Sequence, residues 1–172
     1  MKLSHFPTLI PAFTAQIQID TPLAITPSLL NIPFLPYSGS LTSAPGYPYQ
    51  INARFIHGSD YLRLDPDEQH VRLDVRATAQ DKHTGALLLL VYHGVVDITG
   101  AEGLVIRGDE NAHTTGFGNA FVQVRFETDD DCLVPIEDKM YVGSGRFIVE
   151  EGQPIIVEYK ISEVAAACED RI

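Results

Sequence analysis

Charged and apolar residues alternate along VRLDVRAT, residues 71–78, and the charged ones belong to types that carry acid–base chemistry. In an extended chain, one face of this stretch holds four polar side chains: Arg72, Asp74, Arg76 and Thr78. A carboxylate flanked by two arginines favours its ionised form. Asp74 is therefore a candidate general base or phenol anchor, and Arg76 a candidate stabiliser of a phenolate-like oxygen.

Two further stretches, residues 50–56 and 121–128, repeat this alternation. Their polar faces carry Gln50, Asn52 and Arg54 in the first stretch and Gln123, Arg125 and Glu127 in the second. Two architectures fit the pattern. In a sandwich these faces are external and their ion pairs have little energetic value. In a small antiparallel barrel with a ligand cavity, part of the polar set faces inward and orients a bound molecule.

An acid for catalysis needs a carboxyl whose pKa is raised by burial away from cations. Glu127 meets this condition if Arg125 turns away. Asp60, in HGSDY, is a further candidate, with a turn-stabilising hydrogen bond as its structural alternative. Tyr141, Arg146 and His93 are candidates to supply a proton or a hydrogen bond, or to serve structure alone.

Short alternating runs separated by Gly, Pro, Asp and Asn predict the elements that position these residues. Asp65-Pro66-Asp67 and the DKHTG sequence predict tight turns, and Glu151-Gly152 predicts the turn of a closing hairpin. For the Pro-rich segment 22–49 we expect loop, one short helical turn near 26–31 and a short strand near YSGSL. About eight strands then form one all-β domain, a barrel or a sandwich, with few short helical turns.

Composition and motifs exclude several functions. The net charge of −11 gives nucleic-acid or anionic-membrane binding no electrostatic support. The N-terminus lacks the features of a secretion signal, so we expect a cytoplasmic protein. The two cysteines and six histidines lack metal-site spacing, and neither a GxSxG elbow nor a dinucleotide or phosphate loop occurs. We therefore expect no metal and no cofactor.

Two blocks of the chain resemble the domain-of-unknown-function family 3237. The first, GSDYLRLDPDEQHVRLDVRATAQDKHTGALL, matches at Gly58, Asp60, Leu73, Asp74, Arg76, Thr78 and Gly85. The second, RFETDDDCLVPIEDKMYVGSGRF, matches at Phe126, Glu127, Thr128, Val142, Gly143, Gly145 and Arg146. The resemblance covers about residues 10–163. It implies a single antiparallel β-barrel with an interior pocket, which favours the inward orientation of the polar faces.

Departures from the family pattern resemble a fungal branch associated with natural-product pathways. Tyr61 replaces a usual Trp, LVPIEDK replaces a Trp-Leu-Asn stretch, and residues 33–49 form a Pro/Tyr-rich insertion. The resemblance therefore implies a cofactor-independent cyclase or isomerase of fungal secondary metabolism. Its reaction would be an acid/base-assisted ring closure, such as addition of a hydroxyl to an alkene, on a polyketide- or terpenoid-like substrate.

Within this hypothesis the predicted catalytic residues are Asp74, Arg76, Glu127 and Asp60. The predicted substrate-binding residues are Arg54, Arg72, Thr78, His93, Arg125, Tyr141 and Arg146. The partner is a small molecule, and a homo-oligomer is compatible with the sequence. Two alternatives stay open: a non-catalytic barrel that carries or senses a hydrophobic metabolite, and an assembly module whose polar faces contact water.

Overall fold

The alternating runs form an all-β structure in the computed structural model, which describes residues 4–167. The strands are β1 (Thr8–Gln18), β2 (Leu23–Thr26), β3 (Leu29–Pro33), β4 (Ser38–Ser43), β5 (Asn52–Leu64), β6 (His70–Asp81), β7 (Leu87–Asp97), β8 (Ala120–Thr128), β9 (Tyr141–Ile148) and β10 (Ile156–Ala165). Two short helices accompany them: α1 (Ala101–Ile106) and the 3-10 helix η1 (Val134–Asp138).

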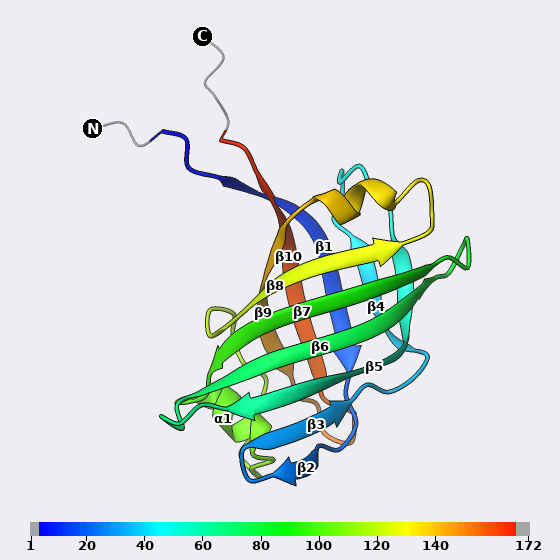
Figure 1. Ribbon diagram of the computed structural model, residues 1–172. Helices are drawn as coiled ribbons and strands as arrows, with labels where there is room; N and C mark the ends of the chain where they lie inside the picture. The colour runs from blue at the N-terminus through cyan, green and yellow to red at the C-terminus, as the bar shows by residue number, and fades with distance from the viewer. Residues whose placement is uncertain (1–3, 168–172) are drawn as a thin grey trace.

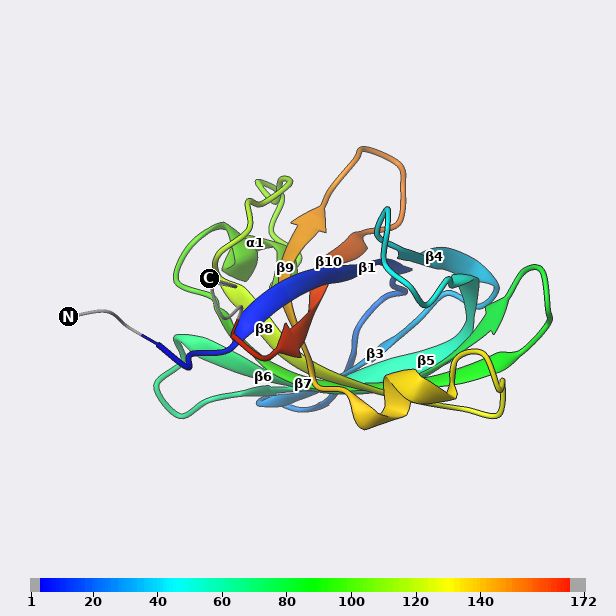
Figure 2. The ribbon, with the colours of Figure 1, turned by 90° about the horizontal axis from the view of Figure 1, so that it is seen from above.

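Eight of the strands close into an antiparallel barrel, and β2 and β3 add to one edge. Pairing runs from β4 through β1, β10, β9, β8 and β7 to β6, and the β5–β6 pair closes the circle. The long strand β5 pairs with β4 along its first part and with β3 along its second. As Figure 2 shows, β1, β10 and β4 lie along one wall and β5, β6 and β7 along the facing wall.

The predicted turns are present, and an aspartate side chain holds the turn between β6 and β7. In the β6–β7 turn, Asp81 Oδ1 accepts the backbone N–H groups of His83 at 2.9 Å and Thr84 at 3.0 Å. Its Oδ2 accepts the N–H of Asn52 at 3.1 Å, which ties the turn to β5. The buried carboxylate therefore satisfies three backbone donors and fixes the register of adjacent strands.

One end of the barrel is filled by aromatic side chains. Phe13 packs against Tyr47 and Phe126 with ring centroids 5.1 and 5.2 Å apart, and Phe126 packs against Tyr141 at 5.2 Å. Edge-to-face pairs of this kind contribute about 0.5–1.5 kcal/mol each beyond the area they bury. Ile136 of η1 is fully buried at this end. The η1 end is therefore closed and packed, while α1 and the β2–β3 hairpin lie at the opposite end (Figure 1).

Two local expectations for the Pro-rich segment 22–49 have different outcomes. The strand near YSGSL is confirmed as β4. The helical turn expected near 26–31 is wrong, because β2 and β3 form a hairpin there. Among residues 4–167, no helix has the length and hydropathy needed to cross a membrane.

Candidate functional site

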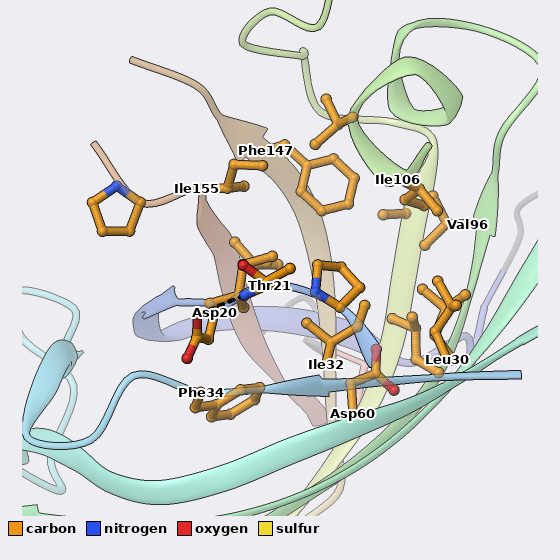
Figure 3. Close-up of a pocket in the computed structure, with 18 of the residues that line it drawn as sticks. Asp20, Thr21, Leu30, Ile32, Phe34, Asp60, Val96, Ile106, Phe147 and Ile155 are labelled. Atoms are coloured by element: carbon orange, nitrogen blue, oxygen red, sulfur yellow. Dashed lines mark hydrogen bonds between the residues drawn. The ribbon is translucent and has the colours of Figure 1, made fainter. Parts of the chain in front are cut away.

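A cavity of about 750 Å³ occupies the end of the barrel beside α1 and the β2–β3 hairpin. Most of its lining is aliphatic or aromatic, and Figure 3 shows Leu30, Ile32, Phe34, Val96 and Phe147 around it. The polar lining residues are Asp20, Thr21, Asp60, Tyr92, Arg107, Arg146 and Tyr159. Such a mostly apolar cavity with few polar groups is typical of a site for a hydrophobic small molecule.

Asp60 is the buried acidic group of this cavity. It lies on β5 between the inward-facing Gly58 and Leu62, is 8% exposed, and points into the cavity in Figure 3. Burial raises the pKa of its carboxyl to about 7, and repulsion from Asp74 acts in the same direction. One hydrogen bond opposes this rise: the backbone N–H of Asp74 donates to Asp60 Oδ1 over 3.0 Å. Near neutral pH both protonation states of Asp60 are therefore populated.

A close approach of Phe34 positions the strand that carries Asp60. A Cβ at residue 58 would lie 2.7 Å from the Phe34 ring and 2.7 Å from the Ala77 side chain, so Gly58 leaves the space that both occupy. The backbone N–H of Phe34 donates to the Gly58 carbonyl at 2.9 Å. Phe34 thus seals the wall beside Asp60 and keeps water from that side of the carboxyl.

Tyr92 and Tyr159 bring two phenols into the same cavity from facing walls, β7 and β10. Their ring centroids are 5.2 Å apart, with an interplanar angle of 63°. Burial raises the pKa of both phenols, and repulsion from Asp60 adds to this. Both phenols stay protonated at neutral pH and can act as donors.

The absence of a side chain at Gly145 leaves the space that the Tyr159 ring occupies. The two residues pair across β9 and β10, and a Cβ at residue 145 would lie 2.5 Å from the ring. Any larger residue would therefore displace the ring.

Charged groups surround the more exposed part of the cavity. Asp20 and Thr21 follow β1, and Arg107 follows α1. Arg146 also contributes to the lining, but its Nε donates to Glu158 at 2.8 Å and its guanidinium lies 5.1 Å from the Phe117 ring centroid. These contacts with Glu158 and Phe117 hold the Arg146 side chain against the barrel wall.

The inward orientation predicted for the polar face of residues 71–78 is wrong. Val71, Leu73, Val75 and Ala77 fill the barrel because burying their apolar surface is favourable, and alternation then turns Arg72, Asp74 and Arg76 outward. The Asp74 carboxylate pairs with His93 at 3.2 Å, and both side chains are more than half exposed. Arg72 pairs with Asp65 at 2.9 Å. Asp74 thus has a histidine partner instead of the expected arginines.

Apart from Asp60 and Arg146, the other predicted residues also lie away from the cavity. Arg54 is exposed, with its guanidinium over the Tyr37 ring, and Arg125 and Glu127 are exposed on the outer face of β8. Thr78 is half-buried on the outer face of β6. Tyr141 is fully buried at the η1 end. Of the predicted side chains, Asp60 and Arg146 line the cavity.

The sequence reading missed Tyr92, Tyr159 and Arg107. Tyr92 ends the apolar run LLLLVY and Tyr159 lies in IIVEYKI, so both look like ordinary core residues. A tyrosine among inward-facing aliphatic residues still needs a partner for its hydroxyl, and this was the available signal.

One surface cluster has the composition of a metal site. Asp65, Asp67 and His70 place ligand atoms within 4.8 Å of one another beside the β5–β6 turn. The Asp65 carboxylate accepts a hydrogen bond from Arg72, and Oδ2 of Asp67 lies 2.9 Å from Nδ1 of His70. These contacts account for the cluster as a turn-stabilising arrangement.

Comparison with solved structures finds proteins of similar fold. The structure is similar to the crystal structure of a conserved protein of unknown function from Rhodopseudomonas palustris, with a TM-score of 0.73, 16% identity, and 95% of this chain and 99% of that one covered. A protein with unknown function from Clostridium acetobutylicum gives a TM-score of 0.70 at 16% identity, covering 93% and 100% of the two chains. A β-barrel-like protein from Acinetobacter baumannii gives 0.65 at 17% identity, covering 92% and 96%.

At these identities the solved structures show a shared fold alone. A search of curated proteins finds no match to the chain. Residues 7–164 match the family described as protein of unknown function (DUF3237), and the chain belongs to that family.

Proposed function

We propose that the protein is a cofactor-independent cyclase or isomerase that transfers a proton on a polyketide- or terpenoid-like molecule bound in the barrel. The observation that carries this proposal is the buried carboxyl of Asp60 in a cavity of about 750 Å³. Fungal natural-product metabolism, the setting indicated by the departures from the family pattern, would supply such substrates.

The protonation behaviour of Asp60 suits both halves of an acid–base reaction. General acid–base catalysis works best when the pKa of the group is close to the working pH. Burial raises the pKa of Asp60 to about 7, whereas an exposed aspartate is almost fully ionised there. Its Oδ1 accepts the Asp74 N–H, which fixes the orientation of the carboxyl. The group can therefore give up and regain a proton at a defined position.

Ring closure would use this group twice. Asp60 gives its proton to one alkene carbon, the substrate hydroxyl oxygen bonds to the other, and the hydroxyl proton returns to the Asp60 carboxylate. No electrons are exchanged with a cofactor in this step. The aliphatic walls contribute by folding the substrate so that the hydroxyl and the alkene meet. Asp60 thus combines the acid role for which it was a candidate with the base role predicted for Asp74, whose side chain faces outward.

A non-catalytic carrier or sensor of a hydrophobic metabolite is the second candidate. The observation that favours it is the lining itself, which is largely apolar and has its charged groups at the more exposed part. A carrier needs shape and apolar area, and its affinity does not depend on a proton-transfer group.

The decisive experiment identifies the substrate and then tests Asp60. Metabolites are compared in cells with and without the protein, and the intermediate that accumulates is incubated with purified protein and no added cofactor. Asp60→Asn should reduce turnover about 100-fold or more and leave the affinity within a few-fold, since general acid–base groups contribute about 10²–10⁴ in rate.

Asp74→Asn is the matched control and should retain turnover. It changes the neighbouring aspartate in the same way but on the outer surface, and the backbone N–H that reaches Asp60 stays. Full activity of Asp60→Asn would refute the catalytic role. Binding of the intermediate without conversion by the native protein would establish the carrier.

A further inference from the structure

We infer that the substrate is an enolisable or α,β-unsaturated carbonyl compound, and that the hydroxyls of Tyr92 and Tyr159 hold its carbonyl oxygen beside Asp60. This inference rests on the proposed function and narrows its substrate class.

The polar lining residues divide into two groups by exposure. Asp20, Thr21 and Arg107 are exposed, and Arg146 is partly so. Asp60, Tyr92 and Tyr159 are buried, at 8%, 4% and 3% exposure. Among the described residues that line the cavity, the remaining members are apolar or glycine. A substrate oxygen in the buried part of the cavity therefore finds its donors in these three side chains.

Strand register brings the three groups together. Asp60 lies opposite Val75 on β6, and Val75 lies opposite Tyr92 on β7, so all three belong to one inward row. Two strand spacings of about 4.8 Å separate the backbones of Asp60 and Tyr92, with Val75 in the row between them. The side chains of Asp60 and Tyr92 both line the cavity. Tyr159 completes the group from the facing wall, with its ring against Tyr92.

The two phenols can offer their hydroxyl protons to the ligand. Tyr92 and Tyr159 both line the cavity, and their ring centroids lie 5.2 Å apart. Burial raises the pKa of both hydroxyls, so both keep their protons at neutral pH. The pair thus matches an oxygen that gains negative charge during reaction.

A carbonyl substrate uses all three groups in one balanced step. In an isomerisation, the Asp60 carboxylate takes the proton from the α-carbon, the C–H electron pair forms the carbon–carbon double bond, and the carbonyl π electrons move to the oxygen. Tyr159 and Tyr92 stabilise that enolate oxygen. When the substrate carries a β,γ double bond, Asp60 then returns the proton to the γ-carbon, the double bond moves to the α,β position, and the carbonyl re-forms.

Conjugate ring closure passes through the same intermediate. Asp60 takes the proton of the substrate hydroxyl, the oxygen bonds to the β-carbon, and the electron pair moves to the carbonyl oxygen. The proton then goes from Asp60 to the α-carbon. A hydrocarbon alkene would instead leave the buried Tyr159 hydroxyl without an acceptor, and that costs binding free energy.

The test uses β-naphthol, a planar phenol whose oxygen on an sp² carbon stands in for the enol or enolate oxygen. Its fluorescence is titrated with Asp60→Asn, in which the neutral amide stands in for protonated Asp60. Adding Tyr159→Phe or Tyr92→Phe to this background should weaken binding about tenfold or more, as expected for loss of a hydrogen bond to a partly charged oxygen. Tyr61→Phe, on the outer face, is the control and should bind unchanged.

A second comparison uses Asp60→Asn alone. It therefore tests the inference even if a tyrosine variant fails to fold. Asp60→Asn should bind β-naphthol about tenfold or more tightly than naphthalene, which has the same ring system without the hydroxyl. Equal affinity for the two compounds, or tyrosine variants that fold and bind β-naphthol like the control, would overturn the inference. The proposed function fails separately, if Asp60→Asn retains turnover of the identified intermediate.

Discussion

Asp60 and Asp74 lie on adjacent strands and face opposite sides of the barrel wall, yet the backbone N–H of Asp74 donates to Oδ1 of Asp60 over 3.0 Å. The Asp74 carboxylate points to solvent and pairs with His93. Asp60 thus depends on the backbone of residue 74, so the contributions of the two carboxyls can be separated by substitution.

Replacing Asp60 by Asn should change how stability depends on pH. The pKa of Asp60 rises from 3.8 to about 7 on folding, so between these values the folded protein holds a proton that the unfolded chain has lost. The free energy of unfolding of the native protein therefore falls as pH rises through this window. Asp60→Asn removes the effect. It should be more stable than the native protein above about pH 8, by up to about 4 kcal/mol, and similar to it near pH 4.

Urea unfolding at a series of pH values measures this difference. Asp74→Asn serves as the control and should keep the downward slope of the native protein. Its window should move slightly toward lower pH, because the substitution removes the repulsion that helps raise the pKa of Asp60. An Asp60→Asn protein with an unchanged pH slope would show that the Asp60 carboxyl does not hold a proton in the folded state.

Filling the cavity should block ligand binding without unfolding the barrel. Ile155 lines the cavity from the β9–β10 connection and is half-buried, so a larger ring there extends into open space. Ile155→Trp should weaken β-naphthol binding about tenfold or more and leave the melting temperature nearly unchanged. Ile10→Trp, at an exposed position of β1, controls for the added ring. Undiminished binding to Ile155→Trp would place the ligand elsewhere.

The Arg146–Glu158 pair should stabilise the wall beside the cavity. Glu158 is 4% exposed and also accepts a hydrogen bond from Gln16 at 2.6 Å. Arg146→Met leaves the buried carboxylate without its cation and should destabilise the protein by about 1–3 kcal/mol, less than for a fully buried pair because Arg146 is one-third exposed. Adding Glu158→Gln should recover part of the loss, and chemical denaturation measures both variants. Equal stability of Arg146→Met and the native protein would contradict this role.

The sequence predicted the architecture better than the site. Alternation and turn residues depend on local contacts, so β4 and the tight turns followed from them. The choice of a closed antiparallel barrel over a sandwich came from the family resemblance. Which face of a strand points inward depends on how the sheet closes. The same alternation in β6 fits either orientation of Asp74, and burial of Val71 and Val75 decided it.

The contact between Tyr92 and Tyr159 could not be predicted from local sequence patterns, for a similar reason. Tyr92 and Tyr159 are far apart in the chain and meet through the pairing of four strands, from β7 to β10. Asp60 was recognisable as a candidate from its motif. Its burial, however, depends on Gly58 and on the approach of Phe34, a contact between distant segments.

A substitution at Tyr141 tests whether the two ends of the barrel act independently. The Tyr141 hydroxyl is 2.8 Å from that of Tyr47, whose own proton goes to Glu163 at 2.6 Å, so Tyr141 donates to Tyr47. Tyr141→Phe removes this one hydrogen bond and should destabilise the protein by about 1 kcal/mol. Because the cavity lies at the α1 end, β-naphthol binding should not change. Denaturation and fluorescence titration of the same sample measure both effects, and a loss of binding at native stability would restore Tyr141 to the ligand site.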